Sequence, residues 1–191
     1  MKKRILLMCI LLLMVVVVTF AHGFREIREK LTGYEETPAA LSTPASAELK
    51  ARINDEGTEI TYELSYEGIA TPVTQAHIHF GKRGESGGVS VFFCSNLASA
   101  PPGTQACPPS PATITGTLKA ENVVGPAAQG IAPGEFDELI RAIRAGTTYA
   151  NIHSMQFPGG EVRAQIEPNK IRRHHGDHGH DDNCDNDRDA H

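Results

Sequence analysis

Three histidines stand at positions where two neighbouring β-strands would bring them together. His77 and His79 are two residues apart in the segment 73–80, whose alternating composition predicts a strand. Side chains at positions i and i+2 of a strand lie on the same face, so both imidazoles are expected on one side of the sheet. His153 lies on the polar face of a second expected strand, 148–153. If these strands are neighbours, three imidazoles converge, which is a donor set that Zn²⁺ or Cu²⁺ accepts.

Glu161 is a candidate for a further metal ligand. Glu161 comes within reach of the histidines if the stretch 157–160, Phe-Pro-Gly-Gly, turns the chain back on itself. Water is the alternative source of this ligand. The histidines also have a structural interpretation, as polar residues of a solvated strand face or as rings hydrogen-bonded in a polar interior. The sequence leaves both interpretations open.

The C-terminal segment 168–191 forms a second cluster of metal-binding side chains. It contains five histidines, six aspartates and Cys184, and almost none of its residues is suited to burial. This composition predicts a disordered tail that binds Zn²⁺, Cu²⁺ or Ni²⁺ weakly, or one that only solubilises the protein. The accessory ligands are predicted to be His174, His175, His178 and His180.

No motif of a known enzyme class is present in the sequence. It lacks the Gly-x-Ser-x-Gly elbow of hydrolases and the His-Glu-x-x-His pair of metalloproteases. The glycine-rich stretch 81–88 lacks the spacing of a phosphate-binding loop. No evident general acid or base accompanies the histidines, so a non-enzymatic protein is expected.

The elements that must position the histidines are short alternating strands. The clearest pair is 45–53 and 60–66, which the turn sequence Asn54-Asp55-Glu56-Gly57 joins into an expected antiparallel hairpin. Many short strands separated by Gly- and Pro-rich stretches predict an all-β antiparallel sandwich or barrel. The other strands are expected at 73–80, 89–93, 113–119, 148–153 and 161–166.

One segment has helical rather than strand periodicity. Phe136, Leu139, Ile140 and Ile143 recur at i, i+3, i+4 and i+7, which predicts a short amphipathic helix that ends near Gly146. We expect this helix to lie across one end of the sheet and to plug the core.

The first 23 residues predict a secretory signal peptide, because three cations precede an apolar run and small residues follow it. An uncleaved anchor is the alternative, since the run is long for a signal peptide. Residues 1–23 contain three cationic side chains and no acidic one, so their removal changes the formal net charge from −5 to −8. A chain this acidic is not expected to bind nucleic acid. No second long apolar run follows. A secreted protein, extracellular, periplasmic or on the cell surface, is therefore expected, without a membrane span after cleavage.

Cys94 and Cys107 flank a Pro-rich segment and are predicted to form a disulfide in an oxidising compartment. Two separate buried thiols are the alternative. Cys184 in the tail has no evident partner, which leaves the oligomeric state open because a tail thiol can join two chains.

Several ordered motifs resemble those of the CHRD domain, a family named for its repeats in chordin. The resemblance spans about residues 31–167 and is weakest at 34–36, where the family usually has small residues and Gln. The motifs are 31–38 (LTGYEETP), 76–81 (AHIHFG), 116–118 (GTL), the helical segment 135–146, 151–154 (NIHS) and 157–166 (FPGGEVRAQI).

The resemblance implies an extracellular all-β domain in which His77, His79 and His153 match the family's histidine motifs. Chordin binds growth factors, a role that kinship of fold does not transfer to a chain with a single domain. A weaker similarity is to copper-zinc superoxide dismutase, another secreted β protein with a His-x-His strand and a disulfide-tethered loop. Dismutase activity is not expected, because that enzyme needs more histidines than this domain offers.

The sequence thus predicts a signal peptide at 1–23, a CHRD-like β domain at 24–167 and a disordered tail at 168–191. The expected function is non-enzymatic binding of a divalent transition metal, copper or zinc, by the histidines of the domain. One alternative is an extracellular or cell-surface module with structural histidines, which would bind a protein partner that the sequence does not identify. The other is a copper or zinc metalloenzyme.

Overall fold

The computed structural model describes residues 26–167, within which the chain forms eight β-strands, one α-helix and three short 3₁₀ helices. The predicted signal peptide, at 1–23, and the predicted tail, at 168–191 with Cys184, lie outside the described residues. The strands are β1 (Glu26–Thr32), β2 (Ser46–Ile53), β3 (Ile60–Glu67), β4 (Val73–Phe80), β5 (Gly88–Ser95), β6 (Ala112–Leu118), β7 (Thr148–Ser154) and β8 (Val162–Ile166). The helices are η1 (Gly33–Glu35), η2 (Ala120–Asn122), η3 (Ala127–Gln129) and α2 (Phe136–Arg144).

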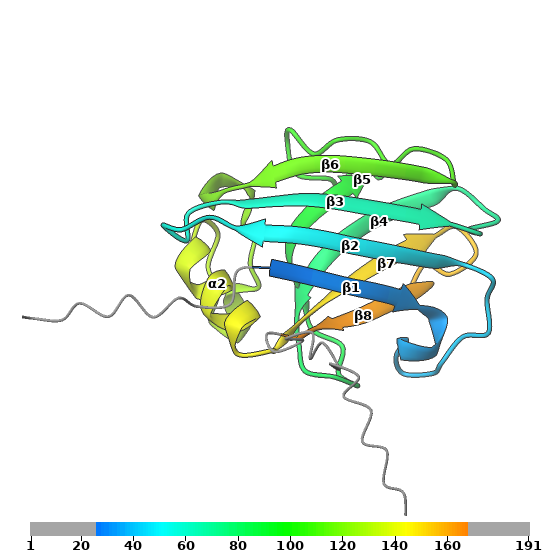
Figure 1. The fold of residues 1–191 in the computed structure, drawn as a ribbon, viewed down its shortest axis with the longest axis horizontal. Coiled ribbons are helices and arrows are strands. Elements are labelled where there is room, and N and C mark those ends of the chain that lie inside the picture. Colours follow the sequence, from blue (N-terminus) through cyan, green and yellow to red (C-terminus); the bar gives the residue numbers. More distant parts are fainter. Residues whose placement is uncertain (1–25, 168–191) are drawn as a thin grey trace, which may run out of the picture.

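The strands form one antiparallel sheet that curls into a nearly closed barrel (Figure 1). The strand order is β5-β4-β7-β8-β1-β2-β3-β6, and β5 and β6, the two edges, contact each other where the barrel almost closes. The prediction of an all-β antiparallel sandwich or barrel with one short helix is confirmed.

Apolar side chains at alternate positions of the strands fill the interior of the barrel. Leu49 in β2 and Leu64 in β3 pair directly across the hairpin and are fully buried. Burial of such a side chain contributes about 2 kcal/mol to folding. The charged residues between the apolar ones face outward and form ion pairs between strands, such as Lys50 with Glu63 at 3.0 Å. The side chain of Asn54 accepts two backbone N–H groups and closes the predicted turn.

The sequence pattern does not predict β1, which pairs with β2 along its whole length and joins that strand to β8. Ile27 and Leu31 point inward, but Glu29, at the inward position between them, is also buried. This charged residue interrupts the apolar alternation on which strand prediction depends. One carboxylate oxygen of Glu29 accepts the backbone N–H of Glu167 at 3.0 Å, so the buried acid helps to hold the end of β8.

The helix α2 lies across one end of the barrel, as predicted (Figure 1). Leu139 and Ile143 are fully buried in the core, and Glu138 forms an ion pair with Arg141 on the exposed side. Gly146 has a φ of +68°, which allows the chain to turn from the helix toward β7. Among residues 26–167, no helix has the length and apolar character needed to cross a membrane.

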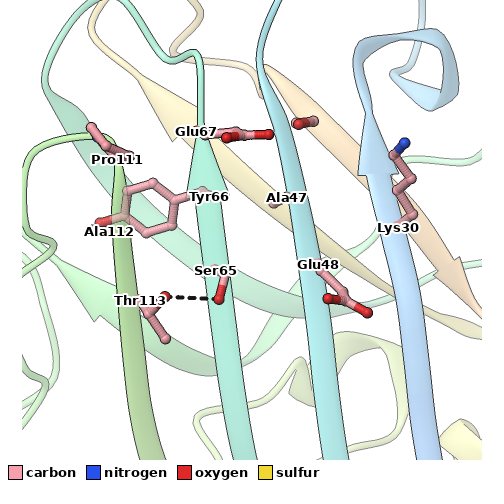
Figure 2. A pocket seen from close by; sticks show the side chains of 10 residues that line it. Lys30, Ala47, Glu48, Ser65, Tyr66, Glu67, Pro111, Ala112 and Thr113 are labelled. Atoms are coloured by element: carbon pink, nitrogen blue, oxygen red, sulfur yellow. Dashed lines mark hydrogen bonds between the residues drawn. The ribbon is translucent and has the colours of Figure 1, made fainter.

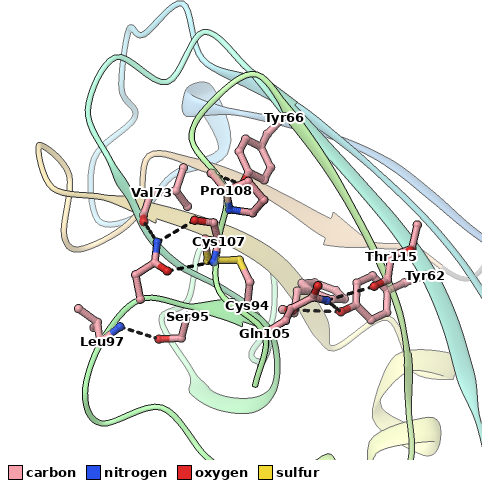
Figure 3. Close-up of a disulfide and its surroundings, with 12 residues drawn as sticks. Tyr62, Tyr66, Val73, Cys94, Ser95, Leu97, Gln105, Cys107, Pro108 and Thr115 are labelled. Carbon is pink, nitrogen blue, oxygen red and sulfur yellow. Dashed lines mark hydrogen bonds between the residues drawn. A yellow bond between two sulfur atoms is a disulfide. The ribbon is translucent and has the colours of Figure 1, made fainter. Parts of the chain in front are cut away.

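The predicted disulfide joins Cys94 in β5 to Cys107 in the connection to β6 (Figure 3). In the same connection, the side chain of Gln105 donates to the hydroxyl of Tyr62 at 2.7 Å and to the carbonyl of Thr115 at 3.1 Å. The connection is therefore attached to β5 by a covalent bond and to β3 and β6 by hydrogen bonds.

A second layer of side chains lies outside the barrel, over β4, β7 and β8. Every residue of β7 and β8 is buried, although only alternate side chains of a strand face the core. The outward side chains are covered by three connecting segments, 33–45, 81–87 and 155–161, which hydrogen-bond to them. This outer layer is polar and contains the three histidines of the domain.

Candidate metal centre

The strands β4 and β7 are neighbours, which is the condition for convergence of the histidines. Their antiparallel register pairs Gln75 with His153 and His77 with Asn151. The ring centroid of His77 lies 5.1 Å from that of His79 and 5.0 Å from that of His153, and the other two rings are 6.1 Å apart. The structure thus brings together the three histidines that the sequence placed on one face.

The ring nitrogens of the three histidines converge. One nitrogen from each lies within 4.8 Å of the others, and among residues 26–167 this is the group of His, Cys, Asp or Glu side chains that could hold a metal ion. The Nδ1 atoms of His79 and His153 lie 3.0 Å and 2.9 Å from the carbonyl oxygens of Gly87 and Pro158. Because a carbonyl only accepts, each Nδ1 carries the proton and each Nε2 presents a lone pair. Metal-binding histidines are usually held in this way.

Several buried nitrogens of this cluster have no hydrogen-bond partner within the described part of the chain. They are Nδ1 and Nε2 of His77, Nε2 of His79 and Nε2 of His153. Each buried polar atom without a partner costs about 1 to 3 kcal/mol, so native proteins keep few of them. A cation held by one nitrogen of each ring would give three of these atoms a partner, and the donor set therefore fits a transition metal ion.

Burial keeps the three rings neutral. It lowers the pKa of His77 to about 2 and the pKa of His79 to about 4, and it also lowers the pKa of His153. The other two histidines add to the shift of His77, because positive charges on neighbouring rings repel each other. Neutral imidazole is the form that binds a metal, so the rings are in the binding form at neutral pH.

Aromatic side chains pack against the histidines. Phe92 in β5 meets the ring of His77 edge-on, with centroids 4.5 Å apart. Tyr149 in β7 stacks parallel to the ring of His79 at 4.7 Å. The exposed fractions of His77, His79 and His153 are 1%, 8% and 7%, so the rings are shielded from bulk water.

Arg163 in β8 connects the covering segments to the barrel wall. Its guanidinium donates to the hydroxyl of Thr37 at 2.7 Å and to the carbonyls of Lys82 at 3.2 Å and Glu85 at 2.8 Å. The guanidinium carbon also lies over the ring of Tyr149, 3.4 Å from its centroid. Within residues 26–167, no carboxylate forms an ion pair with this buried arginine.

Glu161 lies near the histidines but outside their group. The pairing of Ile152 with Val162 places Glu161 across from His153. One carboxylate oxygen of Glu161 accepts the hydroxyl of Thr43 at 2.9 Å, and the other is buried with no partner among the described residues. Of the four ligands predicted in the domain, the structure therefore groups the three histidines and leaves Glu161 apart.

Glu36 is a second buried acid in this layer. Burial raises its pKa to about 7, against the opposing effects of the Arg163 charge and of the hydrogen bond from Asn151. The side-chain amide of Asn151 donates to the carboxylate at 2.6 Å. Gly160 is required beside this contact, because its φ is +130° and a Cβ there would lie 2.7 Å from both side chains.

Sequence reasoning misses Tyr149, Arg163 and Glu36 as members of the site. Parity places Tyr149 on the same strand face as His153, but it gives no sign that this face is covered. Arg163 and Glu36 enter the layer through strand pairing and through the path of the segment 33–45, which no local pattern specifies.

A cavity of about 690 Å³ lies apart from the histidines, on the outer face of β1, β2, β3 and β6 (Figure 2). Lys30, Glu48 and Glu67 line it, and the hydroxyls of Ser65 and Thr113 lie 2.8 Å apart at its edge. Among the described residues, no buried side-chain atom that lacks a hydrogen-bond partner belongs to this cavity. We therefore place the candidate site at the histidines.

The predicted accessory ligands His174, His175, His178 and His180 lie outside the described residues.

In a comparison with known protein families, the model of the CHRD domain family matches residues 27–166 of this chain. No curated protein and no solved structure matches the chain.

Proposed function

This chain belongs to the CHRD domain family, a non-enzymatic family of extracellular modules, and we propose that it binds one copper or zinc ion through His77, His79 and His153. The observation that carries the proposal is the convergence of buried ring nitrogens that have no hydrogen-bond partner in residues 26–167. The carbonyl contacts of His79 and His153 support it, because they select the tautomer that presents Nε2 to an ion.

We also propose that the protein is secreted after removal of residues 1–23. The signal-peptide pattern and the extracellular character of the family agree, and the disulfide is typical of an oxidising compartment. In the secreted chain, the tail histidines act as accessory ligands of low affinity. Mass spectrometry of the exported protein tests the cleavage, since an intact N-terminus would contradict it.

The full chain, expressed for secretion, tests the metal proposal through two matched variants. The domain variant carries His77→Ala and His79→Ala, and the tail variant carries Ser at His174, His175, His178 and His180. Metal content is measured by mass spectrometry, and affinity by calorimetric titration with Cu²⁺ and with Zn²⁺. We expect about one tightly bound ion in the wild type and in the tail variant, and loss of this ion in the domain variant.

The opposite result would favour the interaction module. If the domain variant keeps the tight ion and the tail variant loses it, the histidines of the domain are structural and metal binding belongs to the tail. Their hydrogen bonds to Gly87 and Pro158 would then serve only to attach the covering segments. The surface of the module, rather than the histidine cluster, would be the place to search for a protein partner.

A further inference from the structure

We infer that the three-histidine site selects Cu⁺ over Zn²⁺, and that Arg163 is the residue that determines this preference. The inference rests on the proposed function, because it concerns the charge of the ion that the site holds. It adds an oxidation state and a specificity-determining residue that does not touch the ion.

The ligands add no negative charge to a bound ion. The contacts with the carbonyls of Gly87 and Pro158 fix the tautomer of two imidazoles, so that each presents Nε2, and burial of all three rings favours their neutral form. The net charge of the filled site therefore equals the charge of the ion. Because the cost of burying an ion grows with the square of its charge, a neutral, shielded donor set disfavours a divalent ion relative to a monovalent one.

Arg163 strengthens this preference. Its guanidinium carbon lies 3.4 Å from the centroid of Tyr149, whose ring stacks on His79 at 4.7 Å, so the positive charge is within about 8 Å of a metal ligand. A metal ion bound to the ring of His79 would be repelled by this charge, and a divalent ion would be repelled twice as strongly as a monovalent one.

The two acids of the layer compensate for this charge only in part. Glu36 is bound by the amide of Asn151, and its raised pKa, about 7, means that it is about half protonated at neutral pH. Glu161 has one oxygen bound by the hydroxyl of Thr43 and one that is buried without a partner among the described residues, and it lies outside the ligand group. Within residues 26–167, no carboxylate joins the three nitrogens as a ligand that would neutralise a second positive charge.

The number of donors favours the same ion. Zinc in proteins is almost always bound by four ligands, and the group offers three. A fourth ligand for a divalent ion would have to be water or Glu161; the rings are at most 8% exposed, and Glu161, although one of its oxygens has no partner among the described residues, lies outside the ligand group. A monovalent copper ion is satisfied by the three nitrogens alone.

The test measures the affinities of the full-length tail variant for Cu⁺ and for Zn²⁺ under anaerobic conditions. This tail variant is the parent protein for the substitutions that follow. Cu⁺ affinity is measured by competition with bicinchoninate, and Zn²⁺ affinity by competition with a zinc-binding dye. The variants are Arg163→Gln, which removes the charge, and Arg163→Lys, which keeps the charge but loses the planar hydrogen-bonding group. We expect tighter binding of Cu⁺ than of Zn²⁺ in the parent protein. The ratio of Zn²⁺ to Cu⁺ affinity should rise about tenfold in Arg163→Gln and change little in Arg163→Lys.

Glu36→Gln keeps the inference testable if Arg163→Gln does not fold, because it preserves the shape of the side chain. Loss of a partial negative charge should lower the ratio of Zn²⁺ to Cu⁺ affinity, the opposite direction to Arg163→Gln. Equal or tighter Zn²⁺ binding in the parent protein would overturn the inference and leave the proposed function intact. An equal shift in both Arg163 variants would also overturn it, since the organisation of the loops rather than the charge would then set the preference. Absence of any tight ion would instead refute the proposed function.

Discussion

His77 shows most clearly that the polar layer is not arranged for stability alone. Both of its ring nitrogens are buried without a hydrogen-bond partner among the described residues, and burial lowers its pKa to about 2. A structural histidine would normally have at least one partner, because an unsatisfied buried nitrogen opposes folding. The ring of His77 is therefore suited to bind a metal cation rather than a proton.

Replacement of His77 by Leu separates the metal-binding interpretation from the structural one. The leucine fills a similar volume and removes two unsatisfied nitrogens, so we expect the metal-free protein to gain about 1 kcal/mol in its free energy of unfolding. The same change should abolish tight metal binding. Urea denaturation without metal and calorimetric titration measure the two effects. Gln75→Leu, on the same face of β4, is the control and should leave metal binding unchanged. A metal-free His77→Leu protein that is clearly destabilised would support structural histidines.

The raised pKa of Glu36 predicts that the stability of the protein depends on pH. This pKa is raised from 4.5 to about 7, so between these values the folded protein binds more protons at this site than the unfolded chain does. The stability that this site contributes is complete below pH 4.5 and is lost as the pH rises through 7. Glu36→Gln cannot ionise, and we expect it to stabilise the protein by about 2 kcal/mol at pH 8 and hardly at all at pH 5.

Urea denaturation at the two pH values measures this difference. The histidines are the same in both proteins, so their own titration cancels in the comparison. An equal effect of Glu36→Gln at pH 5 and pH 8 would show that the carboxyl is already ionised across this range.

The periodicity of the sequence is sufficient to group the three histidines but not to find the residues around them. Parity on two strands assigns His77, His79 and His153 to one face, and the adjacency of the strands then brings them together. Arg163 and Glu36 act through the covering segments, whose paths depend on contacts between distant parts of the chain. No local pattern encodes those contacts, so only the structure identifies these two residues.

At the scale of elements, the covering segments determine whether the histidines can serve as ligands. In the segment 81–87, the carbonyl of Gly87 accepts a hydrogen bond from His79. The backbone N–H of Gly87 donates to the hydroxyl of Tyr149 at 3.1 Å. Gly87 has no space for a side chain, because a Cβ would overlap the carbonyl of Phe80. The orientation of one ligand therefore depends on a glycine that touches no metal.

Gly87→Ala should lower metal affinity without changing any ligand. The added methyl group displaces the carbonyl that orients His79, and loss of such a contact typically lowers metal affinity by about 10- to 100-fold. Gly159→Ala is the matched control in the segment 155–161, since its Cβ would meet no atom within 4 Å. Calorimetric titration of both variants measures the effect. Equal affinities would show that the carbonyl contact does not control the ligand.

The strands themselves were predictable wherever alternation is regular. The hairpin of β2 and β3 and the strands that carry the histidines lie close to their expected positions. β1 departs from this rule because Glu29 occupies an inward position. The sequence predicts strands at the positions of β7 and β8, but its pattern does not show that both faces of these strands are buried. Burial of the second face depends on the covering segments, and strand periodicity carries no information about them.

At the scale of the whole molecule, the barrel has two different walls. β2 and β3 expose a charged outer face to solvent, while β4, β7 and β8 carry the covered polar layer. The apolar interior, to which α2 contributes Leu139 and Ile143, packs against both walls. The candidate metal centre therefore lies outside the hydrophobic core, between the barrel wall and the segments that cover it.

This division predicts where a bound metal changes the dynamics of the protein. An ion shared by His77, His79 and His153 links β4 to β7 and, through Gly87 and Pro158, links both strands to the covering segments. We therefore expect added Cu⁺ or Zn²⁺ to slow amide hydrogen exchange in 81–87 and 155–161, and to leave exchange in β2 and β3 unchanged. The tail variant should show the same pattern, and the variant with His77→Ala and His79→Ala should show none. Protection that spreads evenly over the barrel would mean that the ion stabilises the whole fold from another site.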